Sequence, residues 1–154
     1  MQTQFELRDL SKNELAAETI RSFGELRLRV TGSSMLPTLR PDDDLLIRQC
    51  RAEDAAPGDV VLYIRHSRLF VHRVISRCAS QLVTQGDGLA DADVPVSAHE
   101  LLGKVVGAIR RGRPVRREST LTLPARLAAA LFRRSSHAGR FFIRLQSLQG
   151  RIGL

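Results

Sequence analysis

The spacing of hydrophobic residues along the chain changes at Glu25 from a helical period to a period of two. Before Glu25, the Ser-x-x-Glu motif of residues 11–14 resembles a capping box, which typically opens a helix. Gly24 stands where such a helix would end. We therefore predict a short N-terminal helix that starts at Ser11 and lies within residues 1–24.

After Glu25, short apolar runs alternate with segments that favour turns. The turn segments read Pro-Asp-Asp-Asp, Pro-Gly-Asp, Arg-His-Ser and Gly-Asp-Gly, which are typical of connections between antiparallel strands. Residues 25–109 are therefore predicted to form one mainly β unit. Strands are expected at residues 25–30, 44–48, 59–65, 69–75, 81–85 and 103–109.

Residues 110–154 differ from the β unit in charge and in periodicity. A basic linker is followed by apolar residues at helical spacing between arginines over residues 121–149, and most of the excess behind the net charge of +8 lies after Ile109. The pattern predicts a basic, amphipathic helical tail. Three roles stay open for it: lying on an anionic membrane surface, docking on the β unit, or holding a partner protein.

The composition is that of one globular domain. The chain has 154 residues, of which 43% are hydrophobic and 26% charged, which excludes a disordered or fibrous protein. It has no apolar run long enough to span a bilayer, and its start lacks the order of a secretory signal, so we expect a cytoplasmic or peripherally membrane-associated protein. Cys50 and Cys78 lack metal-ligand spacing and are expected to be buried thiols, and no metal or cofactor is predicted.

A nucleophile and a base can be selected from their positions in the predicted β unit. Ser34 follows the first strand in a turn between Gly32 and Pro37, where its hydroxyl would be exposed. Its base would be a histidine, because the proton must pass to a group that titrates near neutral pH. The chain offers His66, His72, His99 and His137. His72 is preferred because it lies in the middle of a predicted strand, where its rotamer can be held.

The segment QGDGLADADVP provides carboxylates that could orient this histidine. It holds Asp87, Asp91 and Asp93, and one of them is expected to accept a hydrogen bond from His72 and stabilise its imidazolium. A solvated acidic loop, a turn-forming serine and a packed strand histidine are the plain structural alternatives. The segment lacks the features of a calcium-binding loop.

Together these segments resemble the motifs of the superfamily that contains type I signal peptidases and LexA-type self-cleaving repressors. The resemblance covers about residues 28–109, and its strongest element is GSSMLPTL at residues 32–39, which is similar to the family's SM-x-PT-L box. The segments PDDDLL, PGDVVLY, VHRV, TQGD and GKVVG follow in the family's order. The resemblance implies a signal-peptidase-like or LexA-like antiparallel β fold.

The resemblance also implies roles for the candidate residues. The serine before methionine is the family's nucleophile, which is Ser34 here. The base position holds His72 rather than lysine, as in the endoplasmic-reticulum, archaeal and sporulating-bacterial branch, and neither Lys12 nor Lys104 matches it. The functional carboxylate of that branch lies six residues after the aspartate of the Gly-Asp motif. This spacing makes Asp93 the first choice, followed by Asp87 and then Asp91.

The oxyanion hole is where the chain departs from the family. The backbone amide of Ser34 matches one donor, but the serine that usually supplies the second donor is replaced by Gly32. Ser33 or another backbone N–H is the alternative donor.

The implied activity is that of a serine endopeptidase that cleaves an extended peptide after small residues, as in signal peptide processing. Two alternatives stay open: a LexA-type DNA-linked regulator and a non-catalytic peptide-binding module with the same fold. Only 33 residues precede Ser34, too few for a helix-turn-helix domain, so nucleic acid is not an expected partner. The expected partners are a peptide or protein substrate and, through the tail, an anionic membrane surface.

Overall fold

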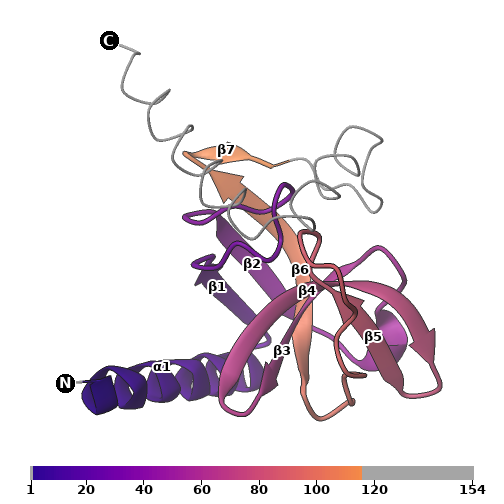
Figure 1. Cartoon of the computed structure of the whole chain (residues 1–154), viewed down its shortest axis with the longest axis horizontal. Coiled ribbons are helices and arrows are strands. Elements are labelled where there is room, and N and C mark those ends of the chain that lie inside the picture. The colour runs from indigo at the N-terminus through magenta and orange to yellow at the C-terminus, as the bar shows by residue number, and fades with distance from the viewer. Residues whose placement is uncertain (1, 116–154) are drawn as a thin grey trace.

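The computed structural model describes residues 2–115, with side chains from Ser11 onward. The predicted helical tail and His137 lie outside the described residues. The described part is mainly an antiparallel β-sheet with one N-terminal helix, α1 (Figure 1). None of its helices combines the length and the apolar character needed to cross a membrane.

All six predicted strands are present, each within a few residues of its expected ends. The sheet order is β1-β2-β6-β3-β4-β5, and a short strand that was not predicted, β7, pairs with β6. A 3₁₀ turn, η1, lies between β2 and β3. The elements are α1 (Gln2–Phe23), β1 (Glu25–Arg29), β2 (Asp44–Gln49), η1 (Ala52–Asp54), β3 (Val60–Arg65), β4 (Arg68–Cys78), β5 (Gln81–Gln85), β6 (Leu101–Arg110) and β7 (Arg113–Pro114).

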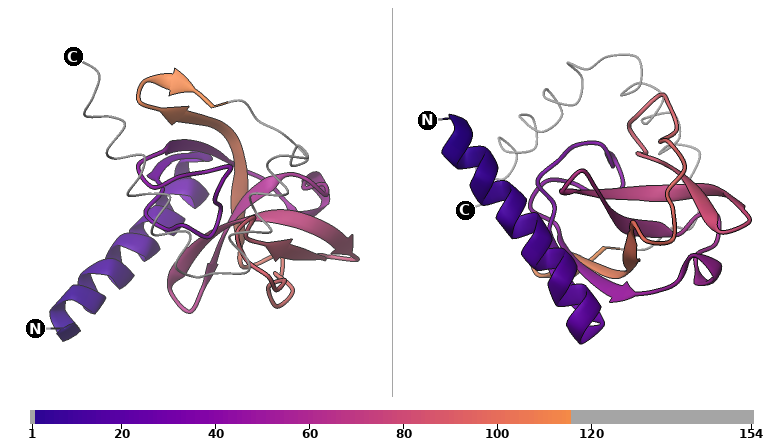
Figure 2. Two further views of the ribbon diagram at one scale, coloured as in Figure 1. Left: turned by 45° about the horizontal axis from the view of Figure 1, so that its top comes forward. Right: turned by 90° about the horizontal axis from the view of Figure 1, so that it is seen from below.

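Helix α1 begins well before the predicted start at Ser11, so residues 11–14 do not cap it. The carboxylate of Glu14 instead accepts a hydrogen bond from Ser67 Oγ (3.0 Å), in the turn before β4. The helix ends at Phe23, and Gly24 follows it as predicted, with a left-handed φ of 76° that favours glycine. Figure 2 shows α1 crossing beside the sheet, with its N-terminal end extending beyond it.

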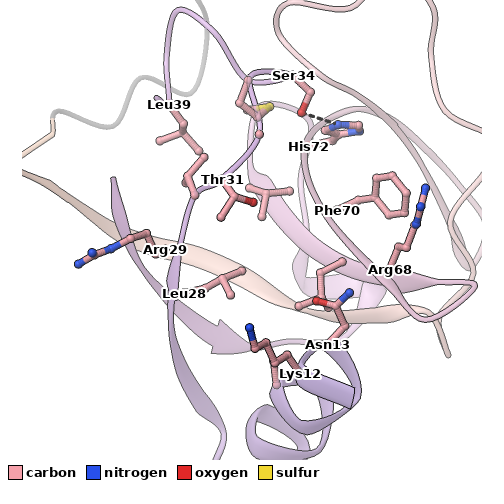
Figure 3. Close-up of a pocket in the computed structure, with 16 residues that line it drawn as sticks. Lys12, Asn13, Leu28, Arg29, Thr31, Ser34, Leu39, Arg68, Phe70 and His72 are labelled. Carbon is pink, nitrogen blue, oxygen red and sulfur yellow. Dashed lines mark hydrogen bonds between the residues drawn. The ribbon is translucent and has the colours of Figure 1, made fainter. Parts of the chain in front are cut away.

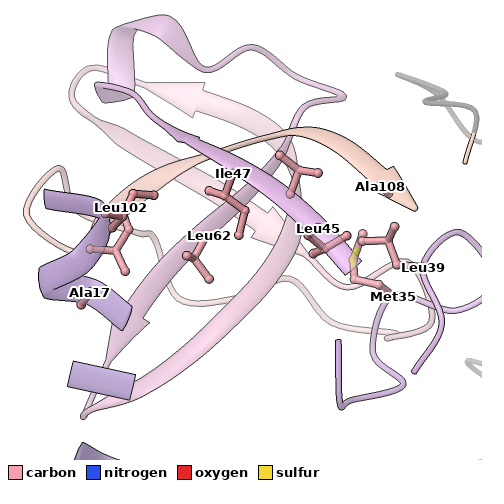
Figure 4. Close-up of a cluster of buried hydrophobic side chains, with 10 residues drawn as sticks. Ala17, Met35, Leu39, Leu45, Ile47, Leu62, Leu102 and Ala108 are labelled. Atoms are coloured by element: carbon pink, nitrogen blue, oxygen red, sulfur yellow. The ribbon is translucent and has the colours of Figure 1, made fainter. Parts of the chain in front are cut away.

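The sheet has a hydrophobic cluster on each face. The first cluster lies against α1 and includes Ala17, Ile20, Met35, Leu39, Leu45, Ile47, Leu62, Leu102, Val105 and Ala108 (Figure 4). The second includes Ala52, Ala55, Val61, Tyr63, Val74, Leu82, Val96 and Leu101. Successive strand residues point to opposite faces, so Leu62 enters the first cluster while Val61 and Tyr63 enter the second. Because His72 pairs with Val61 across the ladder, the imidazole lies on the face of the second cluster.

The hairpin between β3 and β4 sets this register. Its two turn residues, His66 and Ser67, both have positive φ (49° and 56°), as a tight two-residue hairpin turn requires. Asn13 Nδ2 of α1 donates to Ser67 O (3.0 Å) and ties the turn to the helix. A shift of one residue would turn His72 to the other face of the sheet.

The prediction of two buried thiols is wrong for Cys78 and holds only in part for Cys50. Both cysteines are free, Cys50 is half-buried and Cys78 is exposed. Cys78 is the last residue of β4, beyond the part of the strand that the second cluster covers.

The ion pair between Arg65 and Glu100 is expected to make part of the protein's stability depend on pH. Arg65 Nε and Nη2 donate to Glu100 Oε1 and Oε2 (2.6 and 2.8 Å). These bonds, helped by the Ser97 amide and opposed by burial, lower the pKa of Glu100 from its usual 4.5 to about 2. A pKa depressed by folding means that the stabilisation is complete above pH 4.5 and is lost as the pH falls towards 2.

Glu100→Gln is therefore expected to destabilise the protein at pH 7 by about 1–2 kcal/mol after solvent screening, and by less at acidic pH. Urea denaturation at neutral and acidic pH measures both values. Glu53→Gln is the matched control, because the pair of Glu53 with Arg51 is exposed. An equal loss at both pH values would contradict the assignment.

Candidate active site

Ser34 lies in the loop between β1 and β2, held in place by the hydrophobic residues that follow it. Met35, Leu36 and Leu39 are all buried, and Met35 and Leu39 belong to the first cluster. Ser34 itself is half-buried. Burial of its neighbours thus fixes the backbone while the hydroxyl stays at the surface of the pocket shown in Figure 3.

Two polar contacts hold this loop from opposite sides. The Gly88 amide donates to Ser34 O (2.9 Å), which joins the loop to the segment after β5. Arg110 of β6 donates to Thr38 O (3.1 Å) and to both carboxylate oxygens of Asp43 (2.8 and 2.7 Å). The backbone that carries the serine is therefore tied to β6 and to the segment that follows β5.

His72 lies on β4 with its ring against two aromatic residues. Its side chain is 4% exposed. The ring centroids of Tyr63 and Phe70 lie 6.1 and 6.0 Å away in edge-on arrangements. In this fixed position, Nε2 lies 3.1 Å from Ser34 Oγ. That distance suits a hydrogen bond between a serine hydroxyl and its base.

The other ring nitrogen of His72 contacts Asp93. Nδ1 lies 2.7 Å from Asp93 Oδ2, and Thr84 Oγ1 donates to the same oxygen (2.6 Å). The Asp93 amide in turn donates to Thr84 O (2.8 Å), which fixes the loop against β5. Of the three aspartates in the segment, Asp93 is the one that meets the imidazole.

These contacts favour the ionised form of Asp93. Burial opposes ionisation, but the hydrogen bonds of His72, Thr84 and Tyr63 outweigh it and hold the pKa of Asp93 below its usual value. An ionised carboxylate accepts a hydrogen bond from Nδ1–H and so leaves Nε2 as the acceptor for the serine hydroxyl. Burial and the nearby Asp93 also raise the pKa of Tyr63 to about 12, so its hydroxyl keeps its proton.

Asp87, the second choice from the sequence, is bound elsewhere. Its carboxylate accepts two hydrogen bonds from Arg73, from Nε at 2.8 Å and Nη2 at 2.9 Å, and both residues are buried. Asp91, the third choice, is exposed. Neither Asp87 nor Asp91 is therefore the carboxylate partner of His72.

The glycines on either side of Asp87 bring its segment close to the serine loop. A Cβ at Gly86 would lie 2.7 Å from Ser34 O, and one at Gly88 would lie 3.1 Å from Leu36 O. At Gly86 only glycine allows this approach without a shift of the backbone, and at Gly88 a Cβ would be a tight contact. Asp87 thus connects the serine loop to Arg73, which directly follows His72 on β4.

The other candidate bases lie away from Ser34. His66 and His99 are exposed, in the β3–β4 turn and before β6. Lys104 Nζ donates to Asp59 Oδ2 and Asp54 O (3.1 and 3.0 Å). Lys12 lines the same pocket as Ser34, but at the opposite end (Figure 3).

The pocket beside Ser34, called here the Ser34 pocket, has a volume of about 1090 Å³. It lies between β1 and the first half of β4. In the described part of the chain, β1 pairs only with β2, and residues 68–72 of β4 pair only with β3. Both strands therefore offer a free edge. The pocket is lined by residues 12, 13 and 16 of α1, by residues 28–32 and 68–72, and by Ser34, Met35 and Leu39.

Ser33 and Ser34, the residues expected to supply oxyanion donors, lie in a hydrogen-bonded turn. The Leu36 amide donates to Ser33 O (3.1 Å). Gly32 is exposed, and a Cβ there would meet no atom within 4 Å. The glycine at this position is therefore not required by steric contact.

Thr84, Tyr63 and Arg73 belong to the site but were not selected from the sequence. Each adjoins a motif: Thr84 opens TQGD, Tyr63 ends PGDVVLY, and Arg73 follows His72. Polar residues inside such apolar strands are a signal that they have a buried partner. The sequence does not say which partner.

No protein-family model matches the sequence, and no curated protein is similar to it at a significant level. A function for the chain must therefore be inferred from its own residues.

Proposed function

We propose that the protein is a serine endopeptidase with Ser34 as nucleophile, His72 as general base and Asp93 as the residue that orients the base. The observation that carries the proposal is the continuous row of contacts from Ser34 Oγ through the imidazole to Asp93, at 3.1 and 2.7 Å. These residues come from three segments that are far apart in the sequence. A packed or solvated histidine would not need both partners in line.

In this mechanism, Ser34 Oγ attacks the peptide carbonyl carbon while His72 Nε2 takes the hydroxyl proton. The protonated imidazole, stabilised by the Asp93 carboxylate, then gives that proton to the leaving amine as the C–N bond breaks. A water molecule attacks the acyl-enzyme ester with His72 again as base, which releases the acid and restores Ser34. The amide of Ser34 is the first candidate donor to the oxyanion.

The Ser34 pocket supports an extended peptide as substrate. A peptide strand can bind to a free sheet edge through its backbone, whatever its sequence. The edges of β1 and of residues 68–72 both flank the pocket, and His72 lies where the second of these edges ends. By its resemblance to signal peptidases, the enzyme would prefer small residues near the scissile bond.

A serine-reactive fluorophosphonate probe tests the proposal. We expect the folded full-length protein to be labelled at Ser34, as located by peptide mass spectrometry, because the adjacent base activates this hydroxyl. Ser34→Ala should remove the label, whereas Ser76→Ala, which changes an exposed serine of β4, should keep it. Absence of labelling together with absence of peptide cleavage would reject the peptidase.

A peptide-binding module without hydrolysis is the second candidate, because the same free edges suit it. It predicts that the wild-type protein binds peptides as tightly as Ser34→Ala but leaves them intact. Mass spectrometry of peptides incubated with each protein separates the two candidates.

A further inference from the structure

One residue of β5, Thr84, holds Asp93 at two points. The Asp93 amide donates to Thr84 O (2.8 Å), and Thr84 Oγ1 donates to Asp93 Oδ2 (2.6 Å). The same carboxylate oxygen lies 2.7 Å from His72 Nδ1. The oxygen that meets the imidazole therefore also accepts the hydroxyl of Thr84.

The sheet places this hydroxyl on the face of the second cluster. Thr84 pairs with Val74 across the β4–β5 ladder, and Val74 lies two residues after His72, so the three side chains share one face. Thr84 is 0% exposed. Burial of a hydroxyl costs free energy unless it is hydrogen-bonded. Valine would fill the same space without that cost, so the hydroxyl has its use in the bond to Asp93.

The bond has two effects on the carboxylate. It restricts rotation of the carboxylate, because a threonine in a strand has few rotamers and the backbone of Asp93 is bound to the same residue. It also favours the ionised form: burial raises the pKa of Asp93, and the hydrogen bonds of His72 and Thr84 lower it to below its usual value. A hydrogen bond to a charged acceptor is stronger than one between neutral groups.

We propose that Thr84 is a positioning residue of the catalytic site, whose hydroxyl keeps the Asp93 carboxylate turned towards His72 Nδ1 and thereby keeps Nε2 directed at Ser34. Thr84 acts through Asp93 and does not line the Ser34 pocket. The effect on catalysis rests on the proposed function. The hold of Thr84 on Asp93 does not depend on it.

Steady-state kinetics of Thr84→Val test the effect on catalysis, because valine keeps the shape of threonine and removes the hydroxyl. We expect kcat for peptide hydrolysis to fall about tenfold to hundredfold, as for other hydrogen bonds to a charged group, while KM stays within about twofold. Thr84→Ser keeps the hydroxyl and should retain most of kcat. If Thr84 served only to fill space, valine would be the better replacement and serine the worse one.

The same loss of a hydroxyl at Thr19 supplies the control. Thr19 Oγ1 is exposed and donates to Leu15 O within α1, so Thr19→Val should leave kcat unchanged. Thermal melts show whether each variant folds. If Thr84→Val does not fold, Thr84→Cys, which keeps a similar size but has only a weak donor, should lower kcat in its place.

The hold on Asp93 is measured without hydrolysis. Carbon-13 NMR of the side-chain carboxylates over a pH titration of the full-length protein gives the pKa of Asp93, with Asp93→Asn to assign its signal. We expect Thr84→Val to raise this pKa, because the carboxylate stays buried but loses a donor, and Thr84→Ser to leave it near the wild-type value.

An unchanged pKa of Asp93 in Thr84→Val, or a valine variant more active than the serine variant, would overturn the positioning role. So would a kcat of Thr84→Val within twofold of a wild-type protein that cleaves peptides. A raised pKa together with no hydrolysis by the wild-type protein would count against the peptidase and leave the hold of Thr84 on Asp93 standing.

Discussion

Replacing His72 by alanine is expected to lower kcat/KM for peptide hydrolysis by about four orders of magnitude or more. In the proposed mechanism its Nε2, 3.1 Å from Ser34 Oγ, accepts the hydroxyl proton, and without that base the serine would be a weak nucleophile. His72→Gln serves as the second variant, because glutamine keeps a polar side chain near Asp93 but cannot act as a base. Steady-state kinetics on both variants, with thermal melts to show that they fold, measure the loss.

Substitution of Asp93 and of Asp91, two aspartates of the same loop, provides a matched comparison of their effects on kcat. Asp93→Asn should also lose several orders of magnitude in kcat, because an amide cannot hold the imidazole in its Nδ1–H form as the carboxylate does. Asp91→Asn changes an exposed residue of the same loop and should stay within about twofold of wild type. Equal effects of the two changes would remove Asp93 from the mechanism.

Replacing Asp87 by alanine is expected to lower the free energy of unfolding by about 3–5 kcal/mol. The change leaves the guanidinium of Arg73 buried without its carboxylate, since Arg73 is only 7% exposed and gives Asp87 two hydrogen bonds. An uncompensated charge in the interior is far more costly than a lost surface pair. Equilibrium denaturation in urea measures the difference.

A double variant that removes both charges tests whether the unpaired charge of Arg73 causes the loss of stability. Arg73→Met combined with Asp87→Leu should be less destabilising than the sum of the single changes, because no unpaired charge remains. Asp91→Ala, in the same loop but exposed, should change the stability by less than about 0.5 kcal/mol. Simple additivity of the two single changes would show that the pair is not coupled.

The ion pair also connects stability with the site. Asp87 lies between two glycines that pack on the backbone of the serine loop, and Arg73 adjoins His72 on β4. Loss of the pair would therefore loosen the spacing between Ser34 and His72. We expect Asp87→Ala to reduce hydrolysis as well, even at temperatures where the protein remains folded.

Several features of the fold were predictable because local chemistry determines them. Alternating apolar residues and turn segments located all six predicted strands, and Gly24 marked the end of α1. The start of α1 was misplaced because Ser11–Glu14 has the composition of a cap but lies inside a longer helix. Leu15, Ile20 and Phe23 follow a helical spacing, but Leu15 and Phe23 are 68% and 80% exposed, so spacing alone does not identify the buried face of α1.

The candidate site was likewise predictable from the sequence only in part. The motif around Ser34, the strand position of His72 and the count to Asp93 pointed to three residues that the structure brings together. Asp87 carries the same functional group as Asp93, and its pairing with Arg73 was not readable from the sequence. The contribution of Thr84 was not readable either, since it depends on how the loop after β5 folds back on that strand.

By itself, the sequence determined the mainly β character of residues 25–109, the turns between the strands and the small set of residues able to act as nucleophile, base and carboxylate. Only the tertiary structure decided which aspartate meets His72, which one neutralises Arg73, and where Lys12 lies relative to Ser34. The physical reason is that strand and turn preferences act over a few neighbouring residues. Hydrogen bonds and ion pairs between side chains depend on strand register and loop packing, which bring together residues far apart in the chain.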